Sequence, residues 1–303
     1  MLFRSKVILN PYSARWDAGK RQPEMEAALR AAGVSFEVVR SEGPEHGVEL
    51  AAQAVQAGFS PIVAAGGDGT ISEVVNGMMR AAGKGTPPPL GVMPLGTAND
   101  LVNNLGMPTD LEGAARLIAA DRRRPMDLCQ VNERYFVNNA GIGLEPYVTS
   151  IQARMTKVRG IFRYLLATLT AITHNPQWTM KLAWDDGEFE GPVTLVSIGN
   201  SPLTGGIFYT VPHANVFDGK LTFVYGYLPS RGKILRVLPQ TMKPGEGNYV
   251  EHPAVHEVHC TWLKVSVSPG SPAHADGELF SLDATELDYR IHPAHINILT
   301  HPA

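Results

Sequence analysis

The sequence contains little cysteine, and this shortage argues against two kinds of site. Cys129 and Cys260 are the only cysteines in 303 residues, and they lie far apart in the chain. A disulfide framework and a zinc site are therefore not indicated, because both need several cysteine or histidine residues at characteristic spacings. Disulfides are rare in reducing compartments, so we expect the protein to work in such a compartment.

Long apolar runs are also missing. The most apolar stretch, residues 161–172, is interrupted by Arg163, and the apolar run that begins at Val7 is very short. A membrane-spanning helix needs about 20 apolar residues, and a secretory signal needs an apolar region of about 7–15 residues. We expect neither segment, and we expect a cytoplasmic protein that is soluble or peripheral to a membrane.

Net charge is small, since 26 Lys and Arg residues stand against 29 Asp and Glu residues and give −3 at pH 7. This balance provides no general attraction to nucleic acid. Hydrophobic residues make up 44% of the chain and charged residues 18%, a composition that supports a large core and excludes a disordered protein. At roughly 150 residues per domain, the length suggests two domains.

The first third of the chain alternates short apolar runs with stretches at helical spacing, which is typical of a sheet covered by helices. The predicted strands are residues 7–10, 36–40, 61–65 and 90–93, and the predicted helices are residues 24–32, 45–57, 70–82 and 111–120. Gly33, Gly58 and Gly83 follow three of these helices, at the position where a left-handed residue commonly ends a helix. Thr109, with Glu112 three positions later, predicts the cap of the fourth helix.

The pattern becomes β-rich after Arg122-Arg123-Arg124-Pro125, where we place the domain boundary. Residues 1–124 form a predicted α/β domain, and residues 125–290 form a β-rich domain, while residues about 290–303 could pack back on the first. The second domain includes predicted strands at 135–138, 193–198, 221–225 and 255–267, a helix at 149–173 and a shorter helix after Pro229.

Two Asp-Gly pairs predict tight hairpin turns in the second domain. They lie in Asp185-Asp186-Gly187 and in Asp276-Gly277-Glu278. Asp and Gly tolerate the positive φ angles that tight hairpin turns require. The fold class is therefore α/β followed by β.

The strongest local signal is Gly66-Gly67-Asp68-Gly69-Thr70, which follows the predicted strand 61–65 and opens the next helix. Backbone N–H groups of such a loop, together with the helix N-terminus, bind phosphate. A carboxylate inside an anion-binding loop indicates a cation as well. Asp68 therefore suggests Mg²⁺, which uses one or two carboxylates beside substrate phosphates.

Two other interpretations of this loop remain open. A dinucleotide-binding loop would have a third glycine where Ser72 stands, and it would follow the first strand rather than the third. The loop could also be a simple glycine turn between strand and helix. A Walker A loop is excluded, because no Gly-Lys-Ser or Gly-Lys-Thr sequence occurs.

A second loop, Pro94-Leu95-Gly96-Thr97-Ala98-Asn99-Asp100, again joins a strand end to a helix start. In an open α/β sheet both loops would lie at the carboxyl edge, where ligands bind. Asn99 and Asp100 could simply cap the next helix. Thr97 is the better candidate for a phosphate contact, because its hydroxyl would lie near the same edge.

In this order, the motifs resemble the diacylglycerol kinase catalytic-domain family, which includes soluble bacterial lipid kinases and the sphingosine and ceramide kinases. The resemblance covers residues 10–278. Besides the two loops, it is carried by Asn200 with Gly205-Gly206, Pro212-His213-Ala214 before Asp218-Gly219-Lys220-Leu221, and Asp276-Gly277-Glu278. NAD kinases and 6-phosphofructokinases share the glycine-aspartate loop, whereas the ordered set is specific.

The resemblance implies a kinase with an α/β nucleotide-binding domain, a C-terminal β-sandwich domain and ATP in the cleft between them. By motif position, the implied ATP site comprises Asn10, Pro11, Tyr12, Ser13, Ala14, Ser41, Gly66, Gly67, Asp68, Gly69, Thr70, Ile71, Ser72 and Thr97. The family also implies Mg²⁺ at the Asp218 turn, with backbone oxygens near Asn215 and Lys220. Glu278 falls at the proton-acceptor position, Asp276 is close enough to share that task, and Asp68 completes the candidate catalytic set.

The first loop departs from the family pattern. The family has Asn-Pro and a small residue before a glycine-rich segment that ends in lysine. Here the loop runs Asn10-Pro11-Tyr12-Ser13-Ala14-Arg15-Trp16-Asp17-Ala18-Gly19-Lys20, with Ala14 and Arg15 in place of flexible glycine. Arg15 would add positive charge near the phosphates, whereas Trp16 would restrict access to them.

Two features of the second domain bear on the acceptor. Phe162, Tyr164, Leu165, Leu166 and Leu169 lie on the predicted helix 149–173 and would line a site for a lipid tail, or else form ordinary core. Arg154, Lys157, Arg159 and Arg163 lie in the same region and predict a membrane-facing patch, or an ordinary solvated helix face. Each Lys or Arg near an anionic membrane contributes about 1 kcal/mol. A second stretch without acidic residues, 220–245, carries Lys220, Arg231, Lys233, Arg236 and Lys243.

We therefore expect an ATP- and Mg²⁺-dependent lipid kinase of phospholipid biosynthesis, with diacylglycerol as the leading acceptor and a sphingoid base, a monoacylglycerol or a polyprenol as others. The expected partner is a lipid at a membrane surface, and a homodimer stays open. The alternatives are an NAD kinase-like enzyme and a nucleotide-binding regulator without transferase activity. The acidic pair Asp276 and Glu278 late in the chain argues against both.

Overall fold

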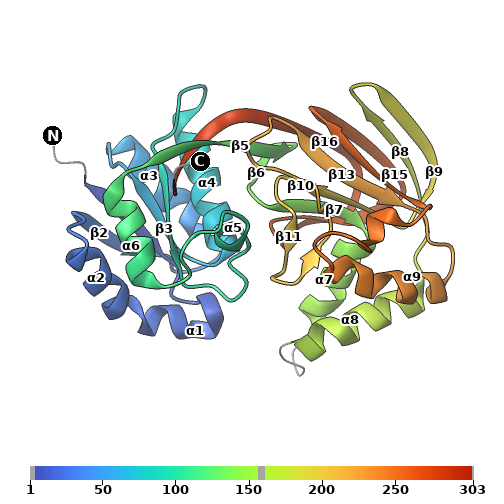
Figure 1. The fold of residues 1–303 in the computed structure, drawn as a ribbon, viewed down its shortest axis with the longest axis horizontal. Helices are drawn as coiled ribbons and strands as arrows, with labels where there is room; N and C mark the ends of the chain where they lie inside the picture. Colours follow the sequence, from blue (N-terminus) through green and yellow to red (C-terminus); the bar gives the residue numbers. More distant parts are fainter. Residues whose placement is uncertain (1–3, 156–160, 302–303) are drawn as a thin grey trace. The chain divides into compact units, whose positions relative to one another are not determined.

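The computed structural model describes residues 4–155 and 161–301, with side chains described throughout these ranges except at 161–165. The chain divides into two compact units (Figure 1). The first unit runs up to Leu128 and resumes at Pro293, and the second unit comprises Cys129–His292. Among the described residues, no helix is long and apolar enough to cross a membrane.

The first unit contains a parallel sheet in the order β2-β1-β3-β4. Its strands are β1 Ser5–Leu9, β2 Phe36–Arg40, β3 Ile62–Gly66 and β4 Leu90–Pro94. The end of β16, Glu278–Leu299, adds a parallel neighbour to β4, where Ile298 pairs with Leu90. Val7, Ile8 and Leu9 are all completely buried, because a parallel strand between helical layers is covered on both faces.

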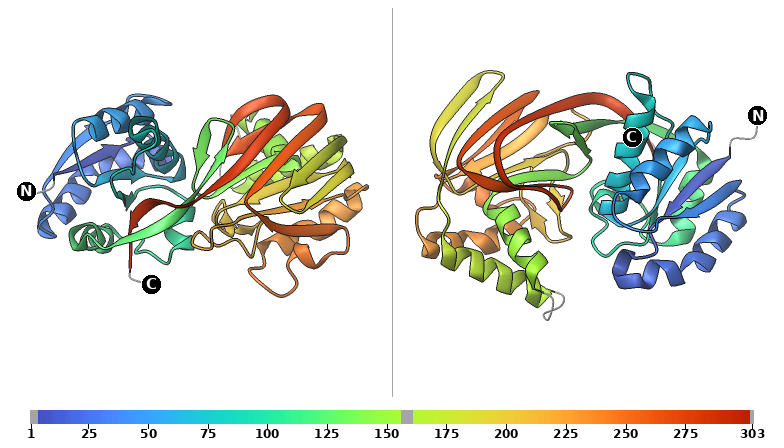
Figure 2. Two further views of the ribbon diagram at one scale, coloured as in Figure 1. Left: turned by 90° about the horizontal axis from the view of Figure 1, so that it is seen from above. Right: turned by 180° about the vertical axis from the view of Figure 1, so that it is seen from behind.

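Helices cover the sheet of the first unit (Figure 2). They are α1 Ser13–Lys20, α2 Gln22–Ala31, α3 His46–Gln56, α4 Asp68–Ala82, α5 Asp100–Asn104 and α6 Leu111–Ala120. Met25, Ala28 and Leu29 of α2 recur at helical spacing and pack into the same core as α6. Gly33 and Gly58 have φ of 77° and 79° and end α2 and α3 as the sequence predicts.

The cap predicted for α6 was placed one residue too early. Asp110, rather than Thr109, is the N-cap residue, and its Oδ1 accepts a hydrogen bond from the Gly113 N–H at 2.7 Å. Asp110 has extended backbone (φ −90°, ψ 152°), which lets its carboxylate turn back on the first turn of the helix.

The second unit is built on an antiparallel sheet in the order β14-β13-β10-β7-β15, with β16 and the β8–β9 hairpin both pairing with β15. Its strands are β5 Arg123–Val131, which starts in the first unit, β6 Arg134–Phe136, β7 Asn139–Gly143, β8 Trp178–Trp184, β9 Gly187–Val193, β10 Leu195–Gly199, β11 Leu203–Thr204, β12 Phe208–Tyr209, β13 Leu221–Gly226, β14 Val255–Cys260, β15 Trp262–Ala275 and β16. The helices are α7 Leu144–Arg154, α8 Ile161–His174 and α9 Arg231–Val237, followed by 3₁₀ helices η1 Leu238–Met242 and η2 Tyr249–Glu251.

The alternating pattern of β8 illustrates how this unit forms its core. Trp178, Met180 and Leu182 are buried while the residues between them are exposed, as expected for a strand with one face on the core. The predicted fold class, an α/β domain followed by a β-sandwich domain, is confirmed.

Some predicted boundaries were wrong in the second unit. The single helix predicted at 149–173 corresponds to two helices, because Met155 (φ −88°, ψ 90°) ends α7, while residues 156–160 lie outside the described residues. The strand predicted at 255–267 is interrupted at Thr261, whose N–H and hydroxyl both donate to the Asp185 carboxylate. The hairpin at Asp185 is confirmed, but Gly187 is already part of β9 and its φ lies outside the left-handed region.

Candidate functional site

The carboxyl ends of β1, β3 and β4 bring three loops of the first unit together. The N–H of Asn10, just after β1, donates to the Ala65 carbonyl at 3.0 Å. The hydroxyl oxygens of Ser13 and Thr70 are 3.3 Å apart. Asn10 Oδ1 accepts a hydrogen bond from the Tyr12 N–H at 3.0 Å, which fixes the start of the first loop. The first loop therefore lies beside the glycine-aspartate loop.

The glycine-aspartate loop turns directly from β3 into α4. A Cβ atom on Gly66 would lie 2.2 Å from Thr70 Oγ1, so only glycine fits there. Gly67 is the extended N-cap residue, and α4 begins at Asp68. The first N–H groups of a helix have no acceptor within that helix, so this turn can bind an anion in the way that helix N-termini bind phosphate.

The second glycine loop packs against the first. The Leu95 N–H donates to the Gly66 carbonyl at 3.0 Å, and a Cβ atom on Gly96 would lie 2.3 Å from Gly67 Cα. Asn99, with φ of 51°, accepts a hydrogen bond from the Gly96 N–H at 3.0 Å and closes its own loop. Asn99 therefore shapes this loop and makes no side-chain cap to α5.

Asp68 connects the two loops. Its Oδ1 accepts a hydrogen bond from the Leu101 N–H in the first turn of α5 at 3.1 Å. The side chain is partly buried at the start of α4. One carboxylate oxygen of Asp68 therefore has a structural partner, and the residue lies at the same edge as the two glycine loops.

The other residues predicted for nucleotide binding have different exposures. Thr97 is exposed in the second loop. Ser41 is buried at the end of β2, where its N–H donates to the Leu9 carbonyl at 2.8 Å. Ile71 and Ser72 are buried in α4, and the Ile71 N–H donates to the Gly67 carbonyl at 3.1 Å. Ile71 and Ser72 therefore support the loop from inside the helix.

The first loop contains a left-handed turn. Ala14, Arg15 and Trp16 have φ of 49°, 61° and 75°, although left-handed backbone costs about 1–2 kcal/mol per residue without glycine. The rings of Tyr12 and Trp16 meet edge to face at 4.6 Å between centroids. Trp16 remains 66% exposed. No motif in the sequence predicted this aromatic pair.

In the second unit, the predicted metal turn follows the segment 209–213. Asp218 Oδ1 accepts a hydrogen bond from the Lys220 N–H at 2.9 Å, and Gly219 has φ of 72°. Asn215 Oδ1 accepts a hydrogen bond from the Phe217 N–H at 3.1 Å. Asp218 and Asn215 are exposed, so the turn presents one carboxylate and several backbone carbonyls near the surface.

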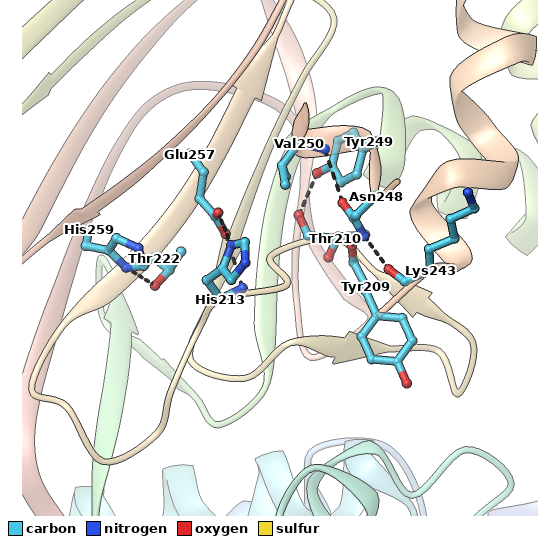
Figure 3. Close-up of polar contacts among 10 residues, drawn as sticks. All are labelled: Tyr209, Thr210, His213, Thr222, Lys243, Asn248, Tyr249, Val250, Glu257 and His259. Atoms are coloured by element: carbon cyan, nitrogen blue, oxygen red, sulfur yellow. Dashed lines mark hydrogen bonds and ion pairs between the residues drawn. The ribbon is translucent and has the colours of Figure 1, made fainter. Parts of the chain in front are cut away.

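Contacts to η2 and β14 fix the segment that leads into this turn (Figure 3). The Tyr249 hydroxyl donates to the Thr210 carbonyl at 2.5 Å, and Asn248 Nδ2 donates to the Tyr209 carbonyl at 3.2 Å. Glu257 accepts a hydrogen bond from the His213 N–H at 3.3 Å, and its Oε2 lies 2.5 Å from His213 Nδ1. Burial and the negative charge of Glu145 raise the pKa of Tyr249, so its hydroxyl stays a neutral donor.

The oxygen chemistry of the Asp218 turn fits Mg²⁺, which binds through one or two carboxylates, carbonyl oxygens and retained waters. Within the described residues there is no group of three or more His, Cys, Asp or Glu side chains that could hold a metal. A site of one carboxylate and backbone oxygens, as predicted here, does not need such a group.

The Asp276-Gly277 pair forms the tight turn between β15 and β16. Ala275 pairs with Glu278 across the turn, and Asp276 and Gly277 have φ of 48° and 81°. The Asp276 carboxylate is buried and accepts hydrogen bonds from the N–H groups of Val137, Asn138 and Asn139 at 3.0, 2.9 and 3.3 Å. Asp276 therefore fixes the hairpin onto the connection between β6 and β7.

Asn200 binds the same connection, since its Nδ2 donates to the Val137 carbonyl at 3.1 Å and its N–H to the Asn138 carbonyl at 2.8 Å. Glu278, by contrast, has a side chain that is 42% exposed, with Oε2 3.6 Å from Arg134 Nη1. The motif residues Asn200 and Asp276 thus meet at one segment, and Glu278 is accessible beside it.

Sequence reasoning missed several residues that shape these sites. They are Arg134 beside Glu278, Glu257 beside His213, and Gly96 as the contact of Gly67. Arg134 and Glu257 carry no motif, and each is far in sequence from its partner. Of these residues, only Gly96 lies in a sequence motif, the second glycine loop.

The comparisons with known proteins cover both units. Residues 4–131 match the diacylglycerol kinase catalytic domain, and residues 138–300 match the YegS C-terminal NAD kinase beta sandwich-like domain. A protein of Chromohalobacter salexigens named "Probable lipid kinase YegS-like" is 32% identical over 90% of this chain and 86% of its own length. The chain belongs to the diacylglycerol kinase catalytic-domain family.

Other members of this family are similar over nearly the same length. A Pseudomonas aeruginosa protein with the same YegS-like name is 33% identical over 90% of this chain and 87% of its own. A diacylglycerol kinase of Staphylococcus saprophyticus is 27% identical over 91% of this chain and 88% of its own. The crystal structure of a diacylglycerol kinase from Bacillus anthracis shares the fold, with a TM-score of 0.75 at 20% identity over 99% of this chain and 97% of that one.

Proposed function

We propose that this chain is a lipid kinase that transfers the γ-phosphate of ATP to the hydroxyl of diacylglycerol in an Mg²⁺-dependent reaction. The observation that carries the proposal is the packing of the two glycine loops at the carboxyl edge of the parallel sheet, where Gly96 contacts Gly67. This edge of an α/β sheet is the usual ligand site, and the start of α4 supports binding of phosphate groups.

In the proposed ATP site, the residues have separate tasks. Backbone N–H groups of Gly67, Asp68 and Gly69 bind phosphate oxygens, and the exposed hydroxyl of Thr97 adds a donor. Asn10 and Ser13 hold the first loop beside them. Gly66, Thr70, Ile71 and Ser72 keep the loop in shape from within. Pro11, Tyr12, Ala14 and Ser41 line the remaining part of the site.

The transfer step forms a bond between the acceptor hydroxyl oxygen and the γ-phosphorus while the bond to the β–γ bridging oxygen breaks. ADP leaves with that electron pair, and the hydroxyl proton goes to the Glu278 carboxylate. The exposure of Glu278 supports this role, since a proton acceptor must reach its substrate. Asp276 positions the hairpin that carries Glu278.

Mg²⁺, when bound, supplies positive charge that offsets the negative charge of the phosphates. Asp68 is the residue that would hold such an ion at the glycine loops of the first unit. Asp218, with backbone oxygens near Asn215 and Lys220, would hold one at the turn of the second unit. The tightly anchored segment 209–213 supports a preformed turn for this purpose.

The substrate places the enzyme at a membrane surface, because diacylglycerol resides in bilayers. We therefore propose a cytoplasmic enzyme that is peripheral to the membrane during turnover. The assignment of a lipid substrate is supported by relatives named diacylglycerol kinase and lipid kinase, which are similar along nearly the whole chain.

An NAD kinase-like activity is the second candidate, because the second unit matches a domain described as NAD kinase beta sandwich-like. The test is to incubate the full chain with γ-labelled ATP, Mg²⁺, mixed diacylglycerol micelles and NAD, and then to extract. We expect label in the organic phase. Label on the dinucleotide would favour the second candidate, and ATP binding without any transfer would indicate a nucleotide-binding regulator.

A further inference from the structure

Four of the large hydrophobic side chains that are exposed in the described residues lie on α8, α9 and η1 of the second unit. Each is 44% to 49% exposed. Four exposed cations accompany them on α9 and just after η1. We define the α8–α9 face by these residues: Leu166, Leu169, Leu235, Met242, Arg231, Lys233, Arg236 and Lys243.

The leucines of this face lie on the solvent side of otherwise amphipathic helices. In α8, Ala167, Ala171 and Ile172 are buried, while Leu166 and Leu169 are exposed. In α9, Ile234 and Val237 are buried, while Leu235 is exposed. These helices therefore make their core contacts through other apolar residues, and the exposed leucines are not needed for packing. Exposed apolar groups gathered on neighbouring elements often mark an interaction site.

The helices of this face are neighbours and are well anchored. The helices α8 and α9 lie next to each other (Figure 1) and are in contact. The Tyr227 hydroxyl, shortly before α9, donates to Gln177 Oε1, shortly after α8, at 3.4 Å. The Ser230 hydroxyl caps α9 by accepting from the Lys233 N–H at 3.3 Å, and Asn248 Nδ2 donates to the Lys243 carbonyl at 2.5 Å (Figure 3).

The charge of the face has one sign. No Asp or Glu occurs from residue 219 to residue 245, the stretch that contains all of its cations. The ion pairs recorded among the described residues include none of Arg231, Lys233, Arg236 and Lys243. These cations are therefore available to an anionic partner.

We propose that the α8–α9 face docks on an anionic phospholipid bilayer, with the cations at the headgroups and Leu235 and Met242 reaching the acyl boundary. A bilayer offers negative charge and an apolar layer next to each other, which matches aliphatic side chains interspersed with Lys and Arg. This proposal rests on the proposed function, because docking would bring the second unit to an acceptor lipid that resides in the membrane. It concerns other residues than the patch predicted at Arg154, Lys157, Arg159 and Arg163. Of those four, Lys157, Arg159 and the side chain of Arg163 lie outside the described residues, and that prediction stays open.

Vesicle binding of the full chain without ATP tests the proposal. The test variant replaces Arg231, Lys233, Arg236 and Lys243 with Glu, and the control variant replaces Arg30, Arg80, Lys84 and Arg116, exposed cations of the first unit, in the same way. On phosphatidylglycerol-containing vesicles, we expect the test variant to bind at least about tenfold more weakly than the wild type, because each basic residue contributes about fivefold. The control should keep wild-type affinity, and wild-type affinity in the test variant would overturn the proposal.

Insertion of the face into a bilayer can also be measured directly. This second test does not require the variant with four Glu substitutions to fold. An environment-sensitive fluorophore is attached to Leu235→Cys and, as a control, to Leu282→Cys, which is exposed on β16. Anionic vesicles should shift the emission at position 235 to the blue and leave position 282 unchanged. No shift at position 235, or a shift that grows with protein concentration alone and accompanies dimer formation, would overturn bilayer docking.

Kinase assays separate this proposal from the proposed function. The test variant should keep turnover on a water-soluble short-chain diacylglycerol and lose it on diacylglycerol in anionic vesicles. Loss on both acceptors to the same extent, with vesicle binding unchanged, would overturn docking. Vesicle binding that requires the α8–α9 face in a protein without any lipid transfer would support docking and contradict the proposed function.

Discussion

Asp276 and Glu278 are separated by one glycine, yet their surroundings differ. Asp276 is buried, and its carboxylate accepts hydrogen bonds from three consecutive N–H groups, 137–139. Glu278 is partly exposed beside Arg134. A carboxylate that already accepts several hydrogen bonds is a poor base. Glu278 is therefore the better candidate for the proposed proton acceptor, and Asp276 is the better candidate for a structural support.

Replacement of the two acidic residues should therefore affect different properties, kcat for Glu278 and the free energy of unfolding for Asp276. We expect Glu278→Gln to lower kcat by about 10²–10⁴-fold with unfolding free energy within about 0.5 kcal/mol of wild type. Asp276→Asn should lower the unfolding free energy by about 1–3 kcal/mol, because its amide places a donor against buried backbone N–H groups. Steady-state kinetics and thermal unfolding of both variants measure this. Equal loss of stability in both would contradict the division of roles.

Cys260 should be inert in the folded protein. Burial, with the negative charges of Asp185 and Asp186, raises the pKa of its thiol to about 12. The thiol then stays protonated at pH 8, and only the thiolate reacts with alkylating reagents. We expect iodoacetamide to leave Cys260 unmodified in the native protein at pH 8 and to modify it after denaturation, as read by mass spectrometry. Native alkylation within minutes would contradict the burial of β14.

The packing of the two glycine loops depends on close backbone contact. Gly96→Ala would place a Cβ atom 2.3 Å from Gly67 Cα, and such overpacking costs about 1–3 kcal/mol. If the loops separate to relieve it, ATP affinity should fall by about tenfold or more. Calorimetric titration with ATP measures this. Gly43→Ala, where nothing lies within 4 Å of the added atom, is the control and should bind like wild type. Unchanged ATP binding in Gly96→Ala would show that the second loop is not part of the nucleotide site.

The segment before the Asp218 turn depends on Glu257. Hydrogen bonds to a charged group contribute about 1.5–3 kcal/mol, so Glu257→Gln should loosen His213 and the turn that follows. We expect the variant to need about tenfold more Mg²⁺ for half-maximal binding, measured by titrating Mg²⁺ against the thermal unfolding midpoint. Glu246→Gln, the same change at an exposed position, should titrate like wild type. An identical Mg²⁺ response in the Glu257 variant would show that this anchor does not support a metal turn.

Local patterns in the sequence predicted most of the elements, and non-local contacts explain what they missed. The apolar run at Val7 was sufficient to predict β1, and the glycines after α2 and α3 were sufficient to predict the ends of those helices. Strand burial and left-handed helix ends depend on residues that are neighbours in the sequence. The division of β14 from β15 depends on Asp185, which is distant in sequence from Thr261. The surroundings of Asp276 depend on residues 137–139 in the same way. Such contacts exist only after folding.

The two units carry different parts of the proposed reaction. The parallel sheet of the first unit provides the phosphate-binding loops. The second unit provides the Asp218 turn, the acidic hairpin and, on its helices, the α8–α9 face. The motif order predicted this two-part fold. The left-handed turn at Ala14 and the exposed leucines of α8 had no sequence pattern that distinguished them from ordinary helix and core.

The proposed activity is phosphorylation of the diacylglycerol hydroxyl at the expense of ATP. The most direct measurement compares ADP with phosphorylated lipid when the full chain receives ATP, Mg²⁺ and either diacylglycerol or the same lipid with its hydroxyl methylated. We expect equal amounts of ADP and phosphatidic acid with diacylglycerol, and neither product with the methylated lipid. ADP that forms equally with both lipids, or no phosphatidic acid at all, would contradict the proposed activity.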